Sequence, residues 1–283
     1  MIYSLAVERE IFMARTVLLA GCGNMGFAML FGWIASGALR PQDVAVVEPN
    51  EALRARAASL GVSVHAAVDD IADPFNPRVV VIAVKPQVMG TVLPHYARFA
   101  RTGSAFLSIA AGINTAFFLS QLGGGTPVIR CMPNTPASIG KGMLVYCCND
   151  AVTAETEAFV AALLSKSGLV AKVDSESLID AVTAVSGSGP AYVFHFIECL
   201  TDAGIAAGLP RETASQLAMQ TVMGAGALAA ESAETPRTLR EQVTSPNGTT
   251  AAALAVFMKD DRLKTLVGEA VEAARLRSIE LGS

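Results

Sequence analysis

The stretch VLLAGCGNMG, residues 17–26, decides the fold that this sequence predicts. A short apolar run leads directly into Gly21, Gly23 and Gly26, which have the spacing G-x-G-x-x-G. Between a strand and a helix, the first glycine makes a tight turn, the second lets the backbone approach a pyrophosphate, and the third allows close packing. The helix N-terminus then offers N–H groups to the phosphates. The pattern predicts a dinucleotide-binding βα unit; a tight turn that binds nothing is the alternative.

Apolar runs recur after this motif. They predict buried strands at 16–20, 44–47, 79–84, 105–110, 127–130, 143–148 and 169–173. Helix-length segments lie between them, and some end at a glycine such as Gly37 or Gly61. Strands that alternate with helices favour an α/β fold with a parallel, doubly wound sheet of the Rossmann type.

Strand signals stop after Val173, and the remaining sequence is helical. Helices are expected to open near Pro190, Pro210 and Pro236, since proline suits the first helical turn. We therefore expect a dinucleotide-binding domain over residues 13–174 and an all-helical domain over residues 175–283. Residues 1–12 are expected to be a disordered or artefactual leader, because the MARTVLLAG that follows looks like a natural start.

Composition and patterning argue against nucleic-acid binding, a membrane span and a metal site. The 283 residues are 52% hydrophobic and carry a net charge of −4, with scattered Lys and Arg, which argues against a nucleic-acid-binding face. No apolar run reaches the roughly 18 residues of a membrane span. The five cysteines show no metal-ligand spacing, so no metal site is expected, and their odd number favours a reducing cytoplasm.

The second predicted strand ends in VVEPN, which places Glu48 roughly 20 residues beyond the last glycine. An acidic residue there usually bonds the ribose hydroxyls of NAD and repels the 2′-phosphate of NADP. Arg54 and Arg56 follow one helical turn later and could attract that phosphate, and Glu48 could merely cap the next helix. The cofactor is NADH or NADPH, with Glu48 favouring NADH.

Two loops follow predicted strand ends, AVKPQ (83–87) and RCMPNTPAS (130–138). The carboxyl ends of parallel strands meet at one edge of a sheet, where open α/β sheets bind ligands. Either loop alone could be an ordinary turn. Together with the glycine loop, they predict the wall around a nicotinamide.

Two polar breaks interrupt the helical part, SGSG (186–189) and TSPNGTT (244–250). In the second, Ser245, Thr249 and Thr250 can donate hydrogen bonds, and the N–H groups from Gly248 onward open the next helix. That arrangement suits a carboxylate without an arginine. The alternatives are a helix connector for the first break and an Asn-Gly turn with a helix cap for the second.

No lysine occurs between Val173 and Met258. Hydroxy-acid dehydrogenases with a similar two-domain plan usually place a lysine on the helical domain to polarise a carbonyl. The three histidines, His65, His95 and His195, lie in sequence contexts that do not suggest an acid–base role. We expect His195 to be a buried core residue. Chemistry that needs little acid–base help is therefore favoured, such as hydride transfer to a C=N bond, because an imine is more basic than a ketone and can arrive protonated.

The motifs GCGNMG, AVKPQ, SIAAGI, RCMPNTP, AVSGSGPAY and VTSPNGTT occur in the order found in Δ1-pyrroline-5-carboxylate reductases, which the chain resembles from about Thr16 to its end. The resemblance implies a Rossmann domain followed by a helical dimerisation domain. It implies hydride transfer from NAD(P)H to the ring imine of 1-pyrroline-5-carboxylate, which gives L-proline in the last step of proline biosynthesis. It also implies a homodimer formed through the helical domain, and larger rings in some members.

By position, the resemblance implies that Thr250 is the catalytic residue, bonded to the ring nitrogen of the substrate. Ser245 and the N–H groups of Gly248 and Thr249 would hold the carboxylate. Asn247 stands where glycine is common. Motifs and resemblance together imply a cofactor site formed by Gly21, Gly23, Asn24, Met25, Gly26, Glu48, Asn50, Ala83, Val84, Lys85, Pro86, Pro133 and Asn134. The alternatives are another NAD(P)-dependent imine or hydroxy-acid reductase, or a non-catalytic nucleotide-sensing protein.

Overall fold

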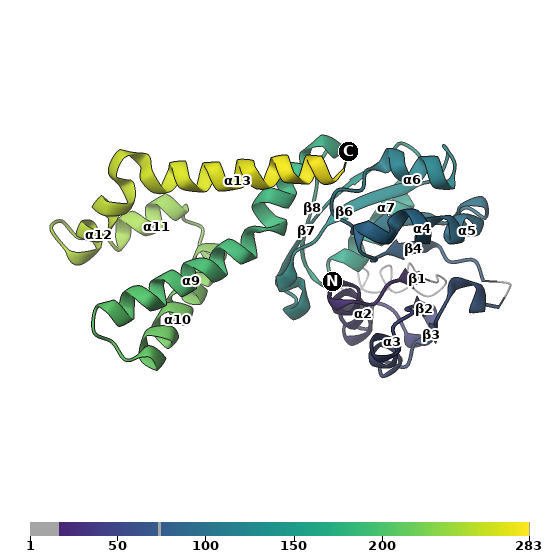
Figure 1. Cartoon of the computed structure of the whole chain (residues 1–283), viewed down its shortest axis with the longest axis horizontal. Coiled ribbons are helices and arrows are strands. Elements are labelled where there is room, and N and C mark those ends of the chain that lie inside the picture. Colours follow the sequence, from purple (N-terminus) through teal and green to yellow (C-terminus); the bar gives the residue numbers. More distant parts are fainter. Residues whose placement is uncertain (1–16, 73–74, 283) are drawn as a thin grey trace. The chain divides into compact units, whose positions relative to one another are not determined.

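A computed structural model describes residues 17–72 and 75–282, and the leader expected over residues 1–12 lies outside these ranges. The described chain forms one sheet with the strand order β3-β2-β1-β4-β5-β6-β7-β8 (Figure 1). Its strands are β1 (Val17–Ala20), β2 (Val44–Val47), β3 (Ser63–His65), β4 (Val79–Ile82), β5 (Ala105–Ser108), β6 (Val128–Met132), β7 (Gly142–Cys148) and β8 (Gly168–Lys172).

The sheet confirms the predicted Rossmann-type architecture with one exception to parallel pairing. β6 and β7 are antiparallel, whereas the other neighbouring strands run parallel. β4 and β5 each end two residues earlier than expected, at Ile82 and Ser108. The apolar run continues beyond the end of β4, but Ala83 and Val84 leave the sheet and form a loop.

β3 was not predicted. It has three residues, Ser63–His65, and lies at the edge of the sheet, so no continuous buried apolar run marks it. Only pairing with β2, residue Ala45 opposite Ser63, identifies it as a strand.

Helices cover both faces of the sheet, as a doubly wound fold requires (Figure 1). On one face, Trp33 of α2 and Phe159 of α7 pack on alternate strand residues such as Leu19. On the other face, Phe99 and Phe118 pack on the opposite set. The helices of this part are α2 (Asn24–Ala35), α3 (Glu51–Ala58), α4 (Met89–Val92), α5 (Ala97–Arg101), α6 (Thr115–Leu122), α7 (Ala154–Leu164) and α8 (Ile179–Val182).

The C-terminal helices begin close to the expected prolines. They are α9 (Gly189–Ala206), α10 (Arg211–Glu231), α11 (Pro236–Gln242), α12 (Thr249–Met258) and α13 (Arg262–Leu281). Pro190 and Pro236 occupy first-turn positions and Pro210 is the N-cap of α10. No helix in the described ranges is long and apolar enough to cross a bilayer.

The chain forms two compact units by its internal contacts. Of the described residues, the first comprises those within 17–187 and 274–282, and the second comprises residues 188–273. The end of α13 belongs to the first unit, where the Ser278 hydroxyl donates to Asp180 Oδ1 at 2.7 Å.

The second unit buries little of its apolar surface. Within it, Ala214 and Ala218 are the buried hydrophobic side chains of the described residues. α9 and α10 lie close together: a Cβ on Gly204 would be 3.1 Å from the Ala214 Cβ. The expectation that His195 is a core residue was wrong, because its side chain is 75% exposed and lies 3.0 Å from Glu198 Oε2. The apolar character of α9 therefore belongs to a surface and not to an internal core.

Candidate functional site

The glycine turn joins β1 to α2. Gly21 has a φ of +88°, and a Cβ there would lie 2.8 Å from the Ala83 carbonyl oxygen. A Cβ on Gly26 would lie 2.5 Å from the Gly21 carbonyl oxygen. At Gly23, by contrast, a Cβ would meet no described atom within 4 Å. The outer glycines are needed for packing of the turn, whereas the central one leaves open space over the backbone, which fits a pyrophosphate.

The AVKPQ loop lies beside this turn because β4 pairs with β1. Ala20 is opposite Ile82, and the Ala83 N–H donates to the Ala20 carbonyl oxygen at 2.8 Å. Lys85 is exposed in this loop. β1 has β2 on one side and β4 on the other, so this edge is the switch point at which open sheets bind ligands.

Glu48 lies at the end of β2 and is 6% exposed. Its Oε2 accepts a hydrogen bond from the Cys22 N–H at 2.7 Å, and its Oε1 accepts one from the Asn50 N–H at 2.9 Å. Two backbone donors therefore fix the carboxylate against the glycine turn.

The two arginines of α3 donate to backbone carbonyls near Glu48. Arg54 Nη1 donates to the carbonyl oxygens of Glu48 at 2.8 Å and Pro49 at 2.9 Å. Arg56 Nη2 donates to the carbonyl oxygen of Cys22 at 3.1 Å. Neither arginine lines the cavity that Glu48 lines.

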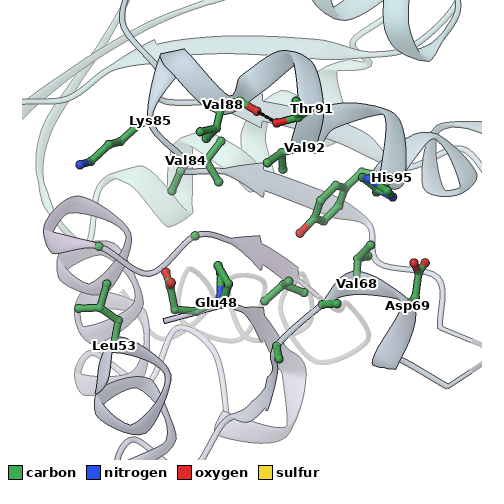
Figure 2. A pocket seen from close by; sticks show the side chains of 18 residues that line it. Glu48, Leu53, Val68, Asp69, Val84, Lys85, Val88, Thr91, Val92 and His95 are labelled. Atoms are coloured by element: carbon green, nitrogen blue, oxygen red, sulfur yellow. Dashed lines mark hydrogen bonds between the residues drawn. The ribbon is translucent and has the colours of Figure 1, made fainter. Parts of the chain in front are cut away.

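A cavity of about 590 Å³ opens at this edge of the sheet, within the range of small-molecule sites. Figure 2 shows Lys85 and His95 at opposite ends of the cavity, and Glu48 across from Val84. The predicted cofactor residues that line it are Gly21, Gly23, Glu48, Ala83, Val84 and Lys85.

One wall of the cavity was not predicted. It consists of Val68 and Asp69 from the segment after β3, and of Thr91, His95 and Tyr96 from α4 and the 3₁₀ turn Leu93–Tyr96. No motif marks these positions. Val68 and Asp69 come near Glu48 because β3 pairs with β2, whereas Thr91, His95 and Tyr96 follow β4, which pairs with β1.

Other predicted cofactor residues lie outside this cavity. Asn24 and Met25 line a second cavity of about 500 Å³, together with Thr135 from the loop after β6. Gly26 and Pro133 are buried, and Pro86 opens a 3₁₀ turn. Asn50 caps α3, since its Oδ1 accepts a hydrogen bond from the Leu53 N–H at 3.0 Å.

Asn134 connects three segments of the first unit. Its Oδ1 accepts a hydrogen bond from the Met143 N–H of β7 at 2.8 Å. Its Nδ2 lies 3.2 Å from the Ser186 carbonyl oxygen and 3.3 Å from the Ser186 hydroxyl, and donates to both. Ser186 belongs to a π-helical turn, Thr183–Gly187, so the RCMPNTP loop contacts the start of the SGSG break.

The second unit contains the TSPNGTT break, which begins with a β-turn. The Gly248 N–H donates to the Ser245 carbonyl oxygen at 3.0 Å, and Asn247 has a φ of +59°. With Pro246 at the second position, a positive φ at the third is typical of a type II turn and favours glycine or asparagine. Asn247 therefore suits the left-handed position of this turn.

α12 begins directly after this turn. Gly248 is its N-cap and provides no side-chain capping bond, so N–H groups of the first turn are available to another acceptor. Ser245 and Thr249 are exposed, and Thr250 is half-buried. Hydroxyls and helix-opening N–H groups thus lie close together, which suits an anion such as a carboxylate.

The thiols show no sign of metal binding or activation. Within residues 17–72 and 75–282, no cluster of three or more His, Cys, Asp or Glu side chains could hold a metal. Burial raises the pKa of the Cys22 thiol to about 11, so it is protonated at neutral pH.

Relatives cover almost the whole chain. It is 42% identical over 263 residues to the pyrroline-5-carboxylate reductase of Pseudomonas aeruginosa, and the match covers 92% of this chain and 94% of the relative. The chain belongs to the pyrroline-5-carboxylate reductase family. The family's Arabidopsis thaliana enzyme is 39% identical over 262 residues, with 92% and 93% coverage. Two family descriptions also match: pyrroline-5-carboxylate reductase dimerisation over residues 176–281, and NADP oxidoreductase coenzyme F420-dependent over residues 16–112.

Solved structures of the family share this fold. The pyrroline-5-carboxylate reductase of Coxiella burnetii is 33% identical, with a TM-score of 0.88 and coverage of 95% of this chain and 99% of that one. The Plasmodium falciparum pyrroline carboxylate reductase, solved with NADP bound, is 29% identical, with a TM-score of 0.82 and coverage of 96% and 100%. The Rossmann-type domain and helical domain predicted from the sequence are therefore confirmed, and the dimerisation match indicates a homo-oligomer.

Proposed function

We propose that this chain reduces the ring C=N bond of 1-pyrroline-5-carboxylate with NAD(P)H to give L-proline, the last step of proline biosynthesis. Membership in the pyrroline-5-carboxylate reductase family supports this. The observation that carries it is the TSPNGTT turn, whose hydroxyls and helix-opening N–H groups suit a carboxylate in a segment without lysine.

The cofactor supplies the hydride, and the chain holds and orients it. Gly21, Gly23 and Gly26, with Asn24 and Met25 at the start of α2, would hold the pyrophosphate. Ala83 to Pro86 would lie along the ribose and nicotinamide, with Pro133 contributing to the same wall. Asn134 would act by fixing its loop, because its amide already bonds Met143 and Ser186.

The substrate would be held from the second unit by the turn before α12. The Ser245 hydroxyl would bond the substrate carboxylate. Because the Gly248 N–H already donates within the turn, the Thr249 N–H is the freer of the two backbone donors. The Thr250 hydroxyl would bond the ring nitrogen and fix the face of the imine that accepts hydride.

The direct test is turnover. Purified protein mixed with 1-pyrroline-5-carboxylate should oxidise NADH or NADPH and form proline in equal amounts. Thr250→Ala serves as the matched control for contaminating reductases. Failure of both cofactors to react, in protein that binds them, would reject the proposed reaction. Turnover of a hydroxy-acid substrate that survives Thr250→Ala would favour the alternative reductase.

We propose that Glu48 makes NADH the preferred cofactor. Its carboxylate is fixed by two backbone N–H groups, so it cannot easily turn away from a 2′-phosphate, and Arg54 and Arg56 are engaged by carbonyls. The experiment compares kcat/KM for NADH and NADPH in wild type and Glu48→Ser. The ratio should move toward NADPH by roughly tenfold or more. An unmoved ratio would remove Glu48 from cofactor selection.

The two parts of the chain would also have different roles in the assembled protein. We propose residues 13–174 as the cofactor-binding part and residues 175–283 as the substrate-binding and dimerisation part, with a homodimer that could assemble into a larger ring. The five cysteines are free, which fits the reducing cytoplasm that we propose as its location. Light scattering of the purified protein would give the assembly size; a monomer at micromolar concentration would reject the dimer.

A further inference from the structure

Tyr96 lines the cavity that Glu48 also lines. The residue is 3% exposed, and its ring packs beside Phe99 with ring centroids 6.3 Å apart. It nevertheless lines the cavity, next to His95 in the sequence. Core packing therefore holds the ring in place while the side chain contributes to the cavity wall.

The Tyr96 hydroxyl has no hydrogen-bond partner among residues 17–72 and 75–282. The hydroxyl is not fully enclosed by the described residues, so it is open to a ligand or to water. Burial, with smaller effects of the carboxylates of Asp69 and Glu48, raises the pKa of Tyr96 above its usual range. The hydroxyl therefore stays protonated and can donate.

The surrounding groups match an adenosine. Glu48 can accept from ribose hydroxyls, and Val68 and Val92 offer apolar contact to a flat base. At the opposite end, Lys85 belongs to the loop assigned to the nicotinamide half (Figure 2). A protonated phenol at the Val68 end would meet the acceptor atoms of a base or its ribose.

We propose that Tyr96 donates a hydrogen bond to the adenosine half of the cofactor and so sets this chain's affinity for it. This assignment rests on the proposed use of NAD(P)H. It adds a cofactor contact that no glycine motif or strand-end rule indicates.

The test is Tyr96→Phe, which removes only the hydroxyl. Calorimetry with ADP-ribose, which carries the adenosine half without the nicotinamide, should show Kd raised by about three- to tenfold. Because no protein group loses a partner, the Tm of the unliganded enzyme should not fall. ADP-ribose binding requires no substrate, so this result is independent of whether pyrroline-5-carboxylate is reduced.

Tyr146→Phe is the matched control. The Tyr146 hydroxyl donates to Glu157 Oε1 at 2.9 Å and does not line the cavity. Its removal should lower Tm by about 2–4 °C and leave the ADP-ribose Kd unchanged. The proposal is overturned if Tyr96→Phe leaves the Kd for ADP-ribose unchanged, or if it lowers Tm as much as Tyr146→Phe does.

Discussion

At the scale of single residues, the proposed reaction assigns different roles to Thr250, which would bond the ring nitrogen of the substrate, and Ser245, which would bond its carboxylate. Thr250→Ala should lower kcat by roughly ten- to a hundredfold, because the bond that would fix the ring nitrogen and the face of the imine toward the nicotinamide is lost. The Kd for NADH should not change. Thr250→Ser, which keeps a hydroxyl, should retain most activity. Steady-state kinetics gives kcat and NADH fluorescence titration gives the Kd for NADH in both variants. An unchanged kcat in Thr250→Ala would contradict the proposed bond to the ring nitrogen.

Ser245→Ala should act differently, since its proposed partner is the substrate carboxylate, which is charged in both ground and transition states. We expect KM for 1-pyrroline-5-carboxylate to rise roughly tenfold with kcat nearly unchanged. A variant with wild-type KM would remove Ser245 from carboxylate binding.

Cys22 illustrates how burial affects pH dependence. Its pKa is raised from 9.0 to about 11, chiefly by burial. Below pH 9 the thiol is protonated in both folded and unfolded chains, so its stabilising contribution is fully present. Between about pH 9 and 11 the unfolded chain ionises first, and the free energy of unfolding falls. Urea denaturation measures the free energy of unfolding at each pH. Its decrease between about pH 9 and 11 should be about 1–3 kcal/mol smaller in Cys22→Ala than in wild type. Equal pH dependence in the two proteins would be the contrary result.

The glycine turn has the packing that its G-x-G-x-x-G spacing predicts, with close contacts at Gly21 and Gly26 and open space at Gly23. Gly23→Ala should fold normally, since its Cβ meets no described atom, yet it should weaken NADH binding by filling the space over the turn. Gly26→Ala should lower the free energy of unfolding by about 1–3 kcal/mol, because its Cβ would press on the Gly21 carbonyl. Thermal denaturation and NADH titration separate the two effects; a Gly23→Ala variant with wild-type NADH affinity would contradict the pyrophosphate role.

Other elements differed in how clearly their sequences marked them. Buried apolar strands and helices opened by Pro190 or Pro236 were predictable, because their signals are local. β3 was not, since its three residues, one exposed and two half-buried, carry no periodicity. His195 was misplaced for a related reason: an apolar helix can pack inside its own domain or present its surface to a partner, and the pattern is the same in both cases.

At the scale of the whole molecule, the helical unit leaves large apolar side chains exposed, among them Phe194 at 58%. An apolar surface of this kind in a family with a dimerisation region is expected to be covered by a second copy. Phe194→Glu should therefore shift the protein toward monomer in light scattering. Leu169→Glu, at a 71% exposed position of β8, adds the same charge to the other unit and should leave the assembly unchanged. A Phe194→Glu protein with the wild-type mass would argue against this surface.

The sequence alone determined the order of elements apart from β3, the glycine turn and the break before α12, because glycine spacing, proline positions and apolar periodicity act over a few residues. Only the tertiary structure decided which segments share a cavity. It brought the segment after β3 and Tyr96 to the wall beside Glu48 and fixed the Glu48 carboxylate with two N–H groups. These features depend on strand pairing between residues distant in sequence, and no local pattern records that pairing.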